Sequence, residues 1–151
     1  MDKYDKQILA ILQRDGRISN KQLAEEVSLS ESSCLRRVRA LEEDGAIDRY
    51  VALLGQNKVG LPGNVFVQIG LQREVGSDLS AFEEAVRHIP EVMECYLMSG
   101  EFDYLLRVVV SDMADFERIH KESLTRLPGV ARVKSSFGIR TVQRNTELPL
   151  R

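Results

Sequence analysis

The chain of 151 residues has no tryptophan and only two cysteines and two histidines. Cys34 and Cys95 form no CxxC pair, so we expect free thiols rather than a disulfide or a thiolate metal site. His88 and His120 lie far apart and lack the spacing of metal ligands. A zinc site and a disulfide scaffold are therefore disfavoured, and we expect no metal and no cofactor.

No apolar run approaches the roughly 18 residues that a membrane span requires, so we expect no membrane partner. The N-terminus, MDKYDKQIL, lacks the basic and then apolar pattern of a signal peptide. Paired catalytic carboxylates, a nucleophile beside its base and a phosphate-binding loop are also missing. We therefore expect a cytoplasmic protein that has no catalytic residues and is not an enzyme.

Residues 17–50, RISNKQLAEEVSLSESSCLRRVRALEEDGAIDRY, have the pattern of two short helices joined by a tight turn. Ser19 and Gln22 form a capping box, and Ser30 is suited to cap the following helix. An earlier helix should end at Gly16 in the left-handed conformation. Three helices of this length and spacing predict a helix-turn-helix domain.

The last of these helices should present one apolar and one polar side. We expect its buried stripe to consist of Cys34, Leu35, Val38 and Leu41. Hydroxyl and guanidinium groups on the opposite side can bond base edges and phosphates in the major groove of DNA. We predict that base edges are read by Ser32, Ser33, Arg36 and Arg37, and that Arg39 mainly contacts phosphate.

The alternative is a plain three-helix bundle whose arginines are simply solvated, which a charge run alone would favour. The helix caps, the turn length and the small Ala24 between the helices together favour DNA binding. The net charge of −2 does not oppose it, because affinity for DNA depends on local neutralisation of phosphates. Ser28 stands where a turn glycine is usual, which would cost about 1 kcal/mol if the position requires positive φ.

The remainder of the chain alternates strands and helices. From Ala46, the sequence IDRYVALL has strand character, and Pro62-Gly63 marks a boundary. After it the predicted order is βαββαβ, with a hairpin at GEFD, which is typical of a ferredoxin-like domain. We predict an α+β protein with a helix-turn-helix domain at 1–50, a hinge strand and linker at 51–63, and a ferredoxin-like domain at 64–151.

Both helices of a ferredoxin-like domain cover the same face of the sheet, so the other face should be polar. Instead Phe66, Leu105 and Val109 are expected on it. A second copy of the same sheet is the simplest cover, and we predict a homodimer. His120 lies on a mostly apolar helix face and is expected to be packed rather than a ligand.

These segments resemble a known family. DGRISNKQLAEEVSLS, CLRRVRALEEDGAI, the hairpin SGEFDYLL and the late LPGV are similar to the Lrp/AsnC, or feast/famine, transcriptional regulators, and closest to the leucine-responsive branch. The similarity covers roughly residues 5–140. It implies a winged or near-winged helix-turn-helix, a hinge strand, and a sensor domain whose dimers commonly assemble into octamers on the nucleoid.

The resemblance also implies that a small effector, usually an amino acid, binds between dimers in a cleft lined by the hairpin. By motif match the cleft residues are Leu97, Met98, Ser99, Gly100, Asp103 and Tyr104, joined by Ser135, Ser136 and Phe137 of a neighbouring subunit. We expect leucine or methionine, with Asp103 accepting from the ammonium group. Asp103 as a simple turn residue is the competing interpretation.

The predicted function is a sequence-specific DNA-binding regulator that responds to an amino acid. One alternative is an architectural DNA-compacting protein whose C-terminal half only oligomerises. An enzyme with a regulatory ligand domain is a further alternative, although no catalytic set supports it.

Overall fold

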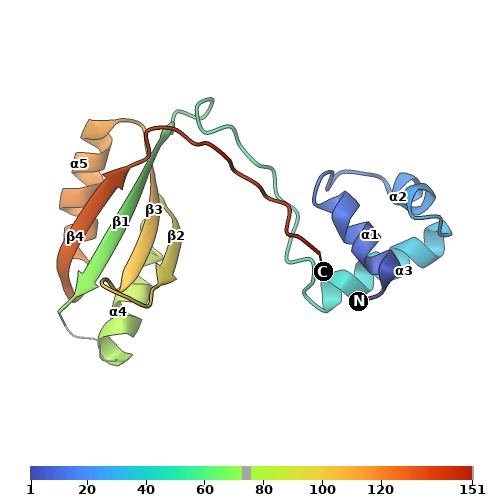
Figure 1. Cartoon of the computed structure of the whole chain (residues 1–151), viewed down its shortest axis with the longest axis horizontal. Coiled ribbons are helices and arrows are strands. Elements are labelled where there is room, and N and C mark those ends of the chain that lie inside the picture. Colours follow the sequence, from blue (N-terminus) through green and yellow to red (C-terminus); the bar gives the residue numbers. More distant parts are fainter. Residues whose placement is uncertain (73–75, 151) are drawn as a thin grey trace. The chain divides into compact units, whose positions relative to one another are not determined.

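The computed structural model describes residues 1–72 and 76–150. The chain divides into two compact units (Figure 1): Met1–Leu53 with the tail from Val142 onward, and Leu54–Thr141. We call them the N-terminal unit and the sensor unit. The tail therefore belongs with the N-terminal unit, whereas the sequence analysis placed it in the C-terminal domain.

The N-terminal unit consists of three short helices around a small core. They are α1 (Lys3–Leu12), α2 (Asn20–Glu26) and α3 (Glu31–Glu43). Capping starts each of them: Ser19 and Gln22 form the predicted capping box, and the Ser30 hydroxyl accepts from the Ser33 amide. The buried core is formed by Ile8, Leu9, Leu23, Ala24, Val27, Cys34 and Leu41.

Three local expectations for this unit were wrong. Gly16 is not left-handed; it leaves room for the ring of Tyr50, which would lie 3.3 Å from a Cβ at that position. Leu35 is 39% exposed, because it projects about 100° away from the buried stripe that Cys34 and Leu41 share. Residues 46–62 form no strand, since no strand of the described chain pairs with them.

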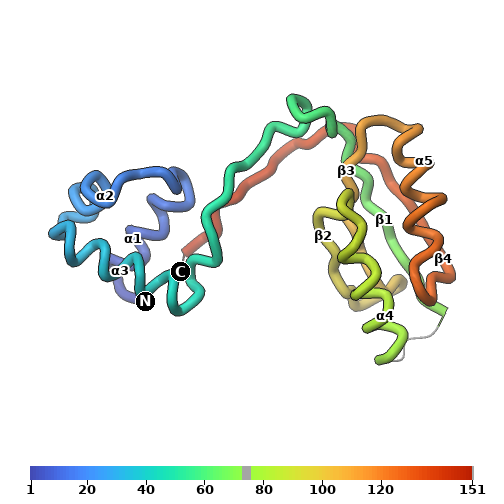
Figure 2. The backbone as a smooth tube through the Cα atoms, turned by 180° about the vertical axis from the view of Figure 1, so that it is seen from behind, coloured from blue at the N-terminus to red at the C-terminus, as the bar shows by residue number. Residues whose placement is uncertain are grey.

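The sensor unit is a four-stranded antiparallel sheet in the order β2-β3-β1-β4, with its helices on one face. This is the predicted ferredoxin-like arrangement. Figures 1 and 2 show the two sides of the sheet. The elements are β1 (Gly63–Leu71), α4 (Gly76–Val86), β2 (Val92–Leu97), β3 (Tyr104–Val110), α5 (Met113–Glu122), the 3-10 turn η1 (Leu124–Arg126) and β4 (Val130–Phe137).

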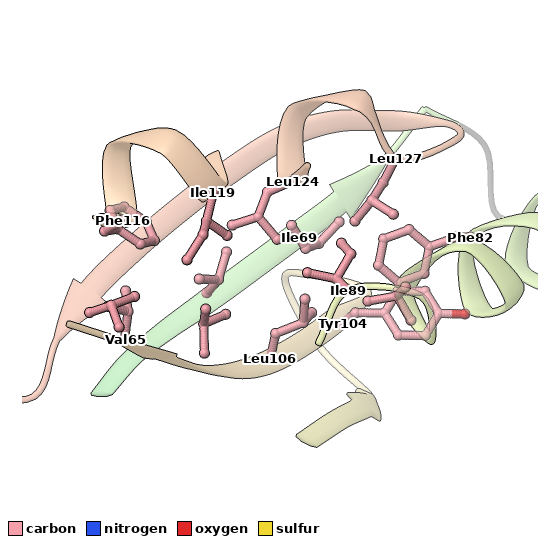
Figure 3. Close-up of a cluster of buried hydrophobic side chains, with 14 residues drawn as sticks. Val65, Ile69, Phe82, Ile89, Tyr104, Leu106, Phe116, Ile119, Leu124 and Leu127 are labelled. Carbon is pink, nitrogen blue, oxygen red and sulfur yellow. The ribbon is translucent and has the colours of Figure 1, made fainter. Parts of the chain in front are cut away.

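The core of this unit lies between the sheet and its helices (Figure 3). Because side chains alternate along a strand, β1 buries Val65, Val67 and Ile69 on this side, opposite Phe82 of α4 and Ile119 of α5. Each fully buried apolar side chain of this size contributes about 1.5–3 kcal/mol. The helix-covered face is therefore fixed by packing.

The open face of the sheet is less apolar than predicted. Phe66 is 41% exposed and Val109 is 4% exposed. Between the apolar positions, Arg107 donates from Nε to Glu94 at 2.8 Å and from Nη1 to the Asn64 Oδ1 at 3.0 Å. This face therefore combines an ion-paired centre with apolar positions.

Among the described residues, no helix is long and apolar enough to cross a membrane.

Candidate DNA-reading helix and ligand cleft

The turn between α2 and α3 fixes how the third helix is presented. Ser28 has φ of 56°, so it adopts the left-handed conformation that costs a serine about 1 kcal/mol relative to glycine. The Leu29 amide donates to the Ala24 carbonyl at 2.9 Å, and the Asn20 side chain donates to the Glu31 carbonyl at 2.9 Å. The two helices are thereby bonded directly at the point where α3 begins.

The predicted DNA-reading side chains occupy different environments. Ser32, Arg36 and Arg39 are exposed, whereas Ser33 and Arg37 are half-buried. Arg36 and Arg39 form no ion pair with any residue that the structure describes. These two guanidinium groups are available to a phosphate or a base edge.

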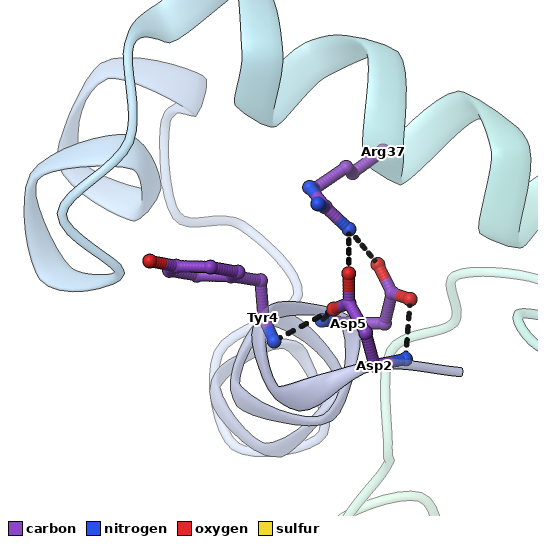
Figure 4. A network of polar contacts seen from close by, with 4 residues as sticks. All are labelled: Asp2, Tyr4, Asp5 and Arg37. Carbon is purple, nitrogen blue, oxygen red and sulfur yellow. Dashed lines mark hydrogen bonds and ion pairs between the residues drawn. The ribbon is translucent and has the colours of Figure 1, made fainter.

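Arg37 is bound within the unit (Figure 4). Its Nη1 lies 2.7 Å from Asp2 Oδ2 and 2.7 Å from Asp5 Oδ1, and its guanidinium lies 5.4 Å from the centre of the Tyr4 ring. These two carboxylates also form the capping box that starts α1. Hydrogen bonds from the Asp5 amide and then from Arg37 lower the pKa of Asp2. Arg37 therefore fastens α3 to the N-terminus of α1, which the sequence analysis did not anticipate.

In the sensor unit, Asp103 ties the hairpin to the end of β1. Its Oδ2 accepts from the Leu71 amide at 2.6 Å, its amide donates to the Ile69 carbonyl at 2.9 Å, and its carbonyl accepts from Met98 at 2.8 Å. One carboxylate oxygen is thus committed to the fold. This contact supports the interpretation of Asp103 as a turn residue and leaves Oδ1 for a ligand.

Tyr104 belongs to the core rather than to an open cleft. Its ring is 1% exposed and stacks on Phe82 at 4.4 Å between ring centres, and its hydroxyl donates to Glu83 at 2.8 Å. Burial, followed by the Glu83 carboxylate, raises the pKa of Tyr104. Of its predicted partners, Leu97, Met98, Ser99 and Gly100 are exposed.

The late-strand residues lie on opposite faces of the sheet. Ser136 pairs with Phe66 and therefore points to the open face. Ser135 and Phe137 pair with buried β1 residues on the helix-covered face. The Phe137 ring meets the ring of Phe116 edge-on at 5.1 Å. Within one chain, β4 does not direct all three side chains to a single cleft.

A groove of about 520 Å³ opens beside the hairpin. It is lined by Gln68, Gly70, Glu101, Phe102, Arg132 and Lys134. The Arg132 Nη2 donates to the Glu101 carbonyl at 3.4 Å, and Gly70 lets the arginine pass close to β1. Neither Arg132 nor Lys134 was among the predicted cleft residues. Their signal was the alternation in VARVKSSF, which places Arg132, Lys134 and Ser136 on one face.

Each half of the chain matches a known protein family. Residues 1–48 match the winged helix-turn-helix DNA-binding family, and residues 64–148 match the Lrp/AsnC ligand binding domain. The chain is 41% identical over 150 residues to the Bkd operon transcriptional regulator of Pseudomonas aeruginosa, covering 99% of this chain and 98% of that protein. It is 40% identical over 151 residues to the leucine-responsive regulatory protein of Escherichia coli K12, covering 100% and 92%.

Solved structures agree with these sequence relatives. An AsnC family transcriptional regulator from Agrobacterium tumefaciens superimposes with a TM-score of 0.94 at 42% identity, covering 99% of this chain and 97% of that one. A transcriptional regulator from Neisseria meningitidis, solved in complex with L-methionine, gives 0.93 at 38% identity, covering 99% and 96%. This chain belongs to the Lrp/AsnC family of ligand-responsive, DNA-binding transcriptional regulators, and it is not an enzyme.

Proposed function

We propose that this regulator binds an apolar α-amino acid, leucine or methionine, and that binding changes its affinity for DNA. The observation that carries the proposal is the groove beside the β2–β3 hairpin, which places a carboxylate and two cations around one opening. The methionine complex of the Neisseria relative and the leucine-responsive name of the Escherichia relative support this choice of ligand.

The groove has the chemistry that an amino acid zwitterion requires. Arg132 and Lys134 supply donors for its carboxylate, and charge-assisted hydrogen bonds of this kind are the strong ones. The Glu101 carboxylate and the remaining Asp103 oxygen are acceptors for its ammonium group. Phe102, which lines the groove, and the exposed Met98, which follows β2, are the proposed apolar contacts, and a thioether adapts to ligands of differing shape.

We also propose a homodimer formed through the open sheet face, with further assembly into octamers. Phe66, which is 41% exposed, and the partly exposed Leu105 supply its apolar part, and Phe66 lies on β1 level with Arg107, one face position from Leu105. Two copies of α3 in one dimer would suit DNA half-sites about 34–36 Å apart, or a multiple of that distance. Light scattering of the full chain should give at least a dimer at micromolar concentration, and a monomer would contradict this part.

Calorimetry with leucine and methionine tests the ligand proposal. Arg132→Ala should weaken binding by about tenfold or more, because a hydrogen bond to a charged group contributes about 1.5–3 kcal/mol. Arg87→Ala is the matched control, since Arg87 is exposed directly after α4 and bonds only to Glu84 at 3.2 Å among the described residues. If neither amino acid binds the wild type while DNA binding persists, the architectural alternative replaces the sensor.

A further inference from the structure

The C-terminal tail is bonded to α1 of the N-terminal unit. The Gln13 side-chain amide donates from Nε2 to the Leu148 carbonyl at 3.2 Å, and its Oε1 accepts from the Leu148 amide at 2.6 Å. One residue's backbone thus exchanges a donor and an acceptor with one side chain, as paired residues of neighbouring strands do. These two hydrogen bonds fix which tail residue lies beside Gln13.

An apolar groove of about 210 Å³ adjoins this amide. Leu12, Ile47 and Tyr50 line one side of it, and Leu148 and Leu150 of the tail itself line the other. The side chain of Leu150 packs against the N-terminal core, whereas that of Leu148 is 74% exposed. Pro149 between them favours an extended conformation of the preceding residue. The tail is therefore held by the backbone of one leucine and the side chain of the other.

We propose that the chain's own residues 148–150, which are seated beside this groove, act as a latch that increases affinity for DNA. The latch follows β4 along the chain, so the chain passes between the two units twice, at Leu53–Leu54 and at Thr141–Val142. A second connection lowers the conformational freedom that is lost when α3 binds DNA. The proposal goes beyond the effector response and does not depend on it.

Hydrogen exchange of the full-length protein tests the docking. Gln13→Ala and Leu150→Asp should each accelerate exchange at the backbone amides of residues 46–50 and at the end of α1 by roughly tenfold, because local opening becomes easier. Val142→Asp is the control in the same tail, since Val142 is 84% exposed. This control should exchange at the wild-type rate.

Mixing the two variants shows whose tail is docked. The Leu150→Asp protein keeps an intact groove, and the Gln13→Ala protein keeps an intact tail. Docking within one chain predicts no recovery of slow exchange after mixed assemblies form. Recovery would mean that a second copy supplies the tail, and would overturn the assignment to the chain's own segment.

DNA titration at one fixed salt concentration tests the functional part of the proposal. Both variants should bind a preferred DNA fragment about threefold to tenfold more weakly than the wild type and Val142→Asp do. Wild-type exchange rates in both variants would overturn the docking. Accelerated exchange together with unchanged DNA affinity would overturn the latch.

Discussion

The candidate site of the N-terminal unit is formed by residues close together in the sequence, whereas that of the sensor unit is formed by residues far apart. In the N-terminal unit, the turn at Ser28 and the cap at Ser30 set the start of α3 within a few residues. In the sensor unit, the groove combines Gln68 of β1, Glu101 of the hairpin and Arg132 of β4, which meet only through strand pairing. Local patterns therefore predict a DNA-reading helix more completely than they predict a ligand cleft.

Arginine residues show the same contrast within one unit. Arg36 and Arg37 are adjacent in sequence, yet only Arg37 reaches Asp2 and Asp5, which lie 35 and 32 residues away. A guanidinium held by two carboxylates at 2.7 Å must exchange those partners before it can bind DNA. We therefore propose different roles for these neighbours: contact with DNA for Arg36, and attachment of α3 to α1 for Arg37.

The largest effect is expected at Tyr104, where substitutions distinguish a role in the core of the sensor unit from a role in ligand binding. Tyr104→Ala should lower the unfolding free energy of this unit by about 3–5 kcal/mol, because it empties a fully buried aromatic site. Tyr104→Phe should cost about 1 kcal/mol, the worth of the lost hydrogen bond to Glu83, and should leave amino acid binding unchanged. Exchange rates of β1 and β3 amides measure the stability, and calorimetry measures the ligand.

A weaker ligand affinity in a normally folded Tyr104→Phe protein would return this hydroxyl to the cleft, as the family resemblance implied. Unchanged exchange rates in Tyr104→Ala would contradict the placement of this ring in the core.

The next largest effects are expected at Arg36 and Arg37, and they should differ in kind. Arg36→Ala should weaken specific DNA binding by about 1–3 kcal/mol if the side chain forms a bidentate base contact, without loss of stability. Arg37→Ala should instead destabilise the N-terminal unit, because Asp2 and Asp5 lose their common cation. Fluorescence anisotropy on DNA and thermal unfolding, measured on both variants, separate the two roles. Equal effects on both measurements would remove the distinction.

The sequence anticipated much of this architecture and less of the sites. Helix starts could be predicted because Ser19 and Ser30 satisfy backbone amides within the first turn. The clamp on Arg37 could not, since an ion pair across more than 30 residues has no local pattern. The same holds for Arg132, whose place beside Glu101 depends on the register of β4 against β1. Tyr104 was assigned by motif, and alternation along β3 would have placed it with the buried Leu106.

A smaller effect is expected at the turn before α3. Ser28→Gly should stabilise the N-terminal unit by about 0.5–1 kcal/mol, because glycine adopts positive φ without the steric cost that serine carries. Thermal unfolding of the variant measures this change. Ser32→Gly, on an exposed position within α3, is the control and should destabilise instead, since glycine is a poor helix former. A lower melting temperature for Ser28→Gly would contradict the strain assigned to this turn.

The smallest effect is a dependence on acid. Because the folded chain lowers the pKa of Asp2 below its ordinary value of 3.8, its contribution is present above pH 3.8 and is lost as pH falls below it. Asp115 in the sensor unit, which accepts from the Ser111 amide and Arg118, follows the same sign. Asp2→Asn should flatten the acid dependence of the N-terminal unit alone. Flattening of both units would show that their stabilities are coupled.

A DNA titration with and without amino acid tests whether ligand binding in the sensor unit is coupled to DNA binding by the N-terminal unit. A genomic fragment selected by the protein is titrated at constant salt, first alone and then with saturating leucine or methionine. We expect one of the two amino acids to shift the dissociation constant by at least about fivefold, the lower end of typical allosteric coupling. Tight binding of the fragment that stays unchanged with all twenty amino acids would contradict it.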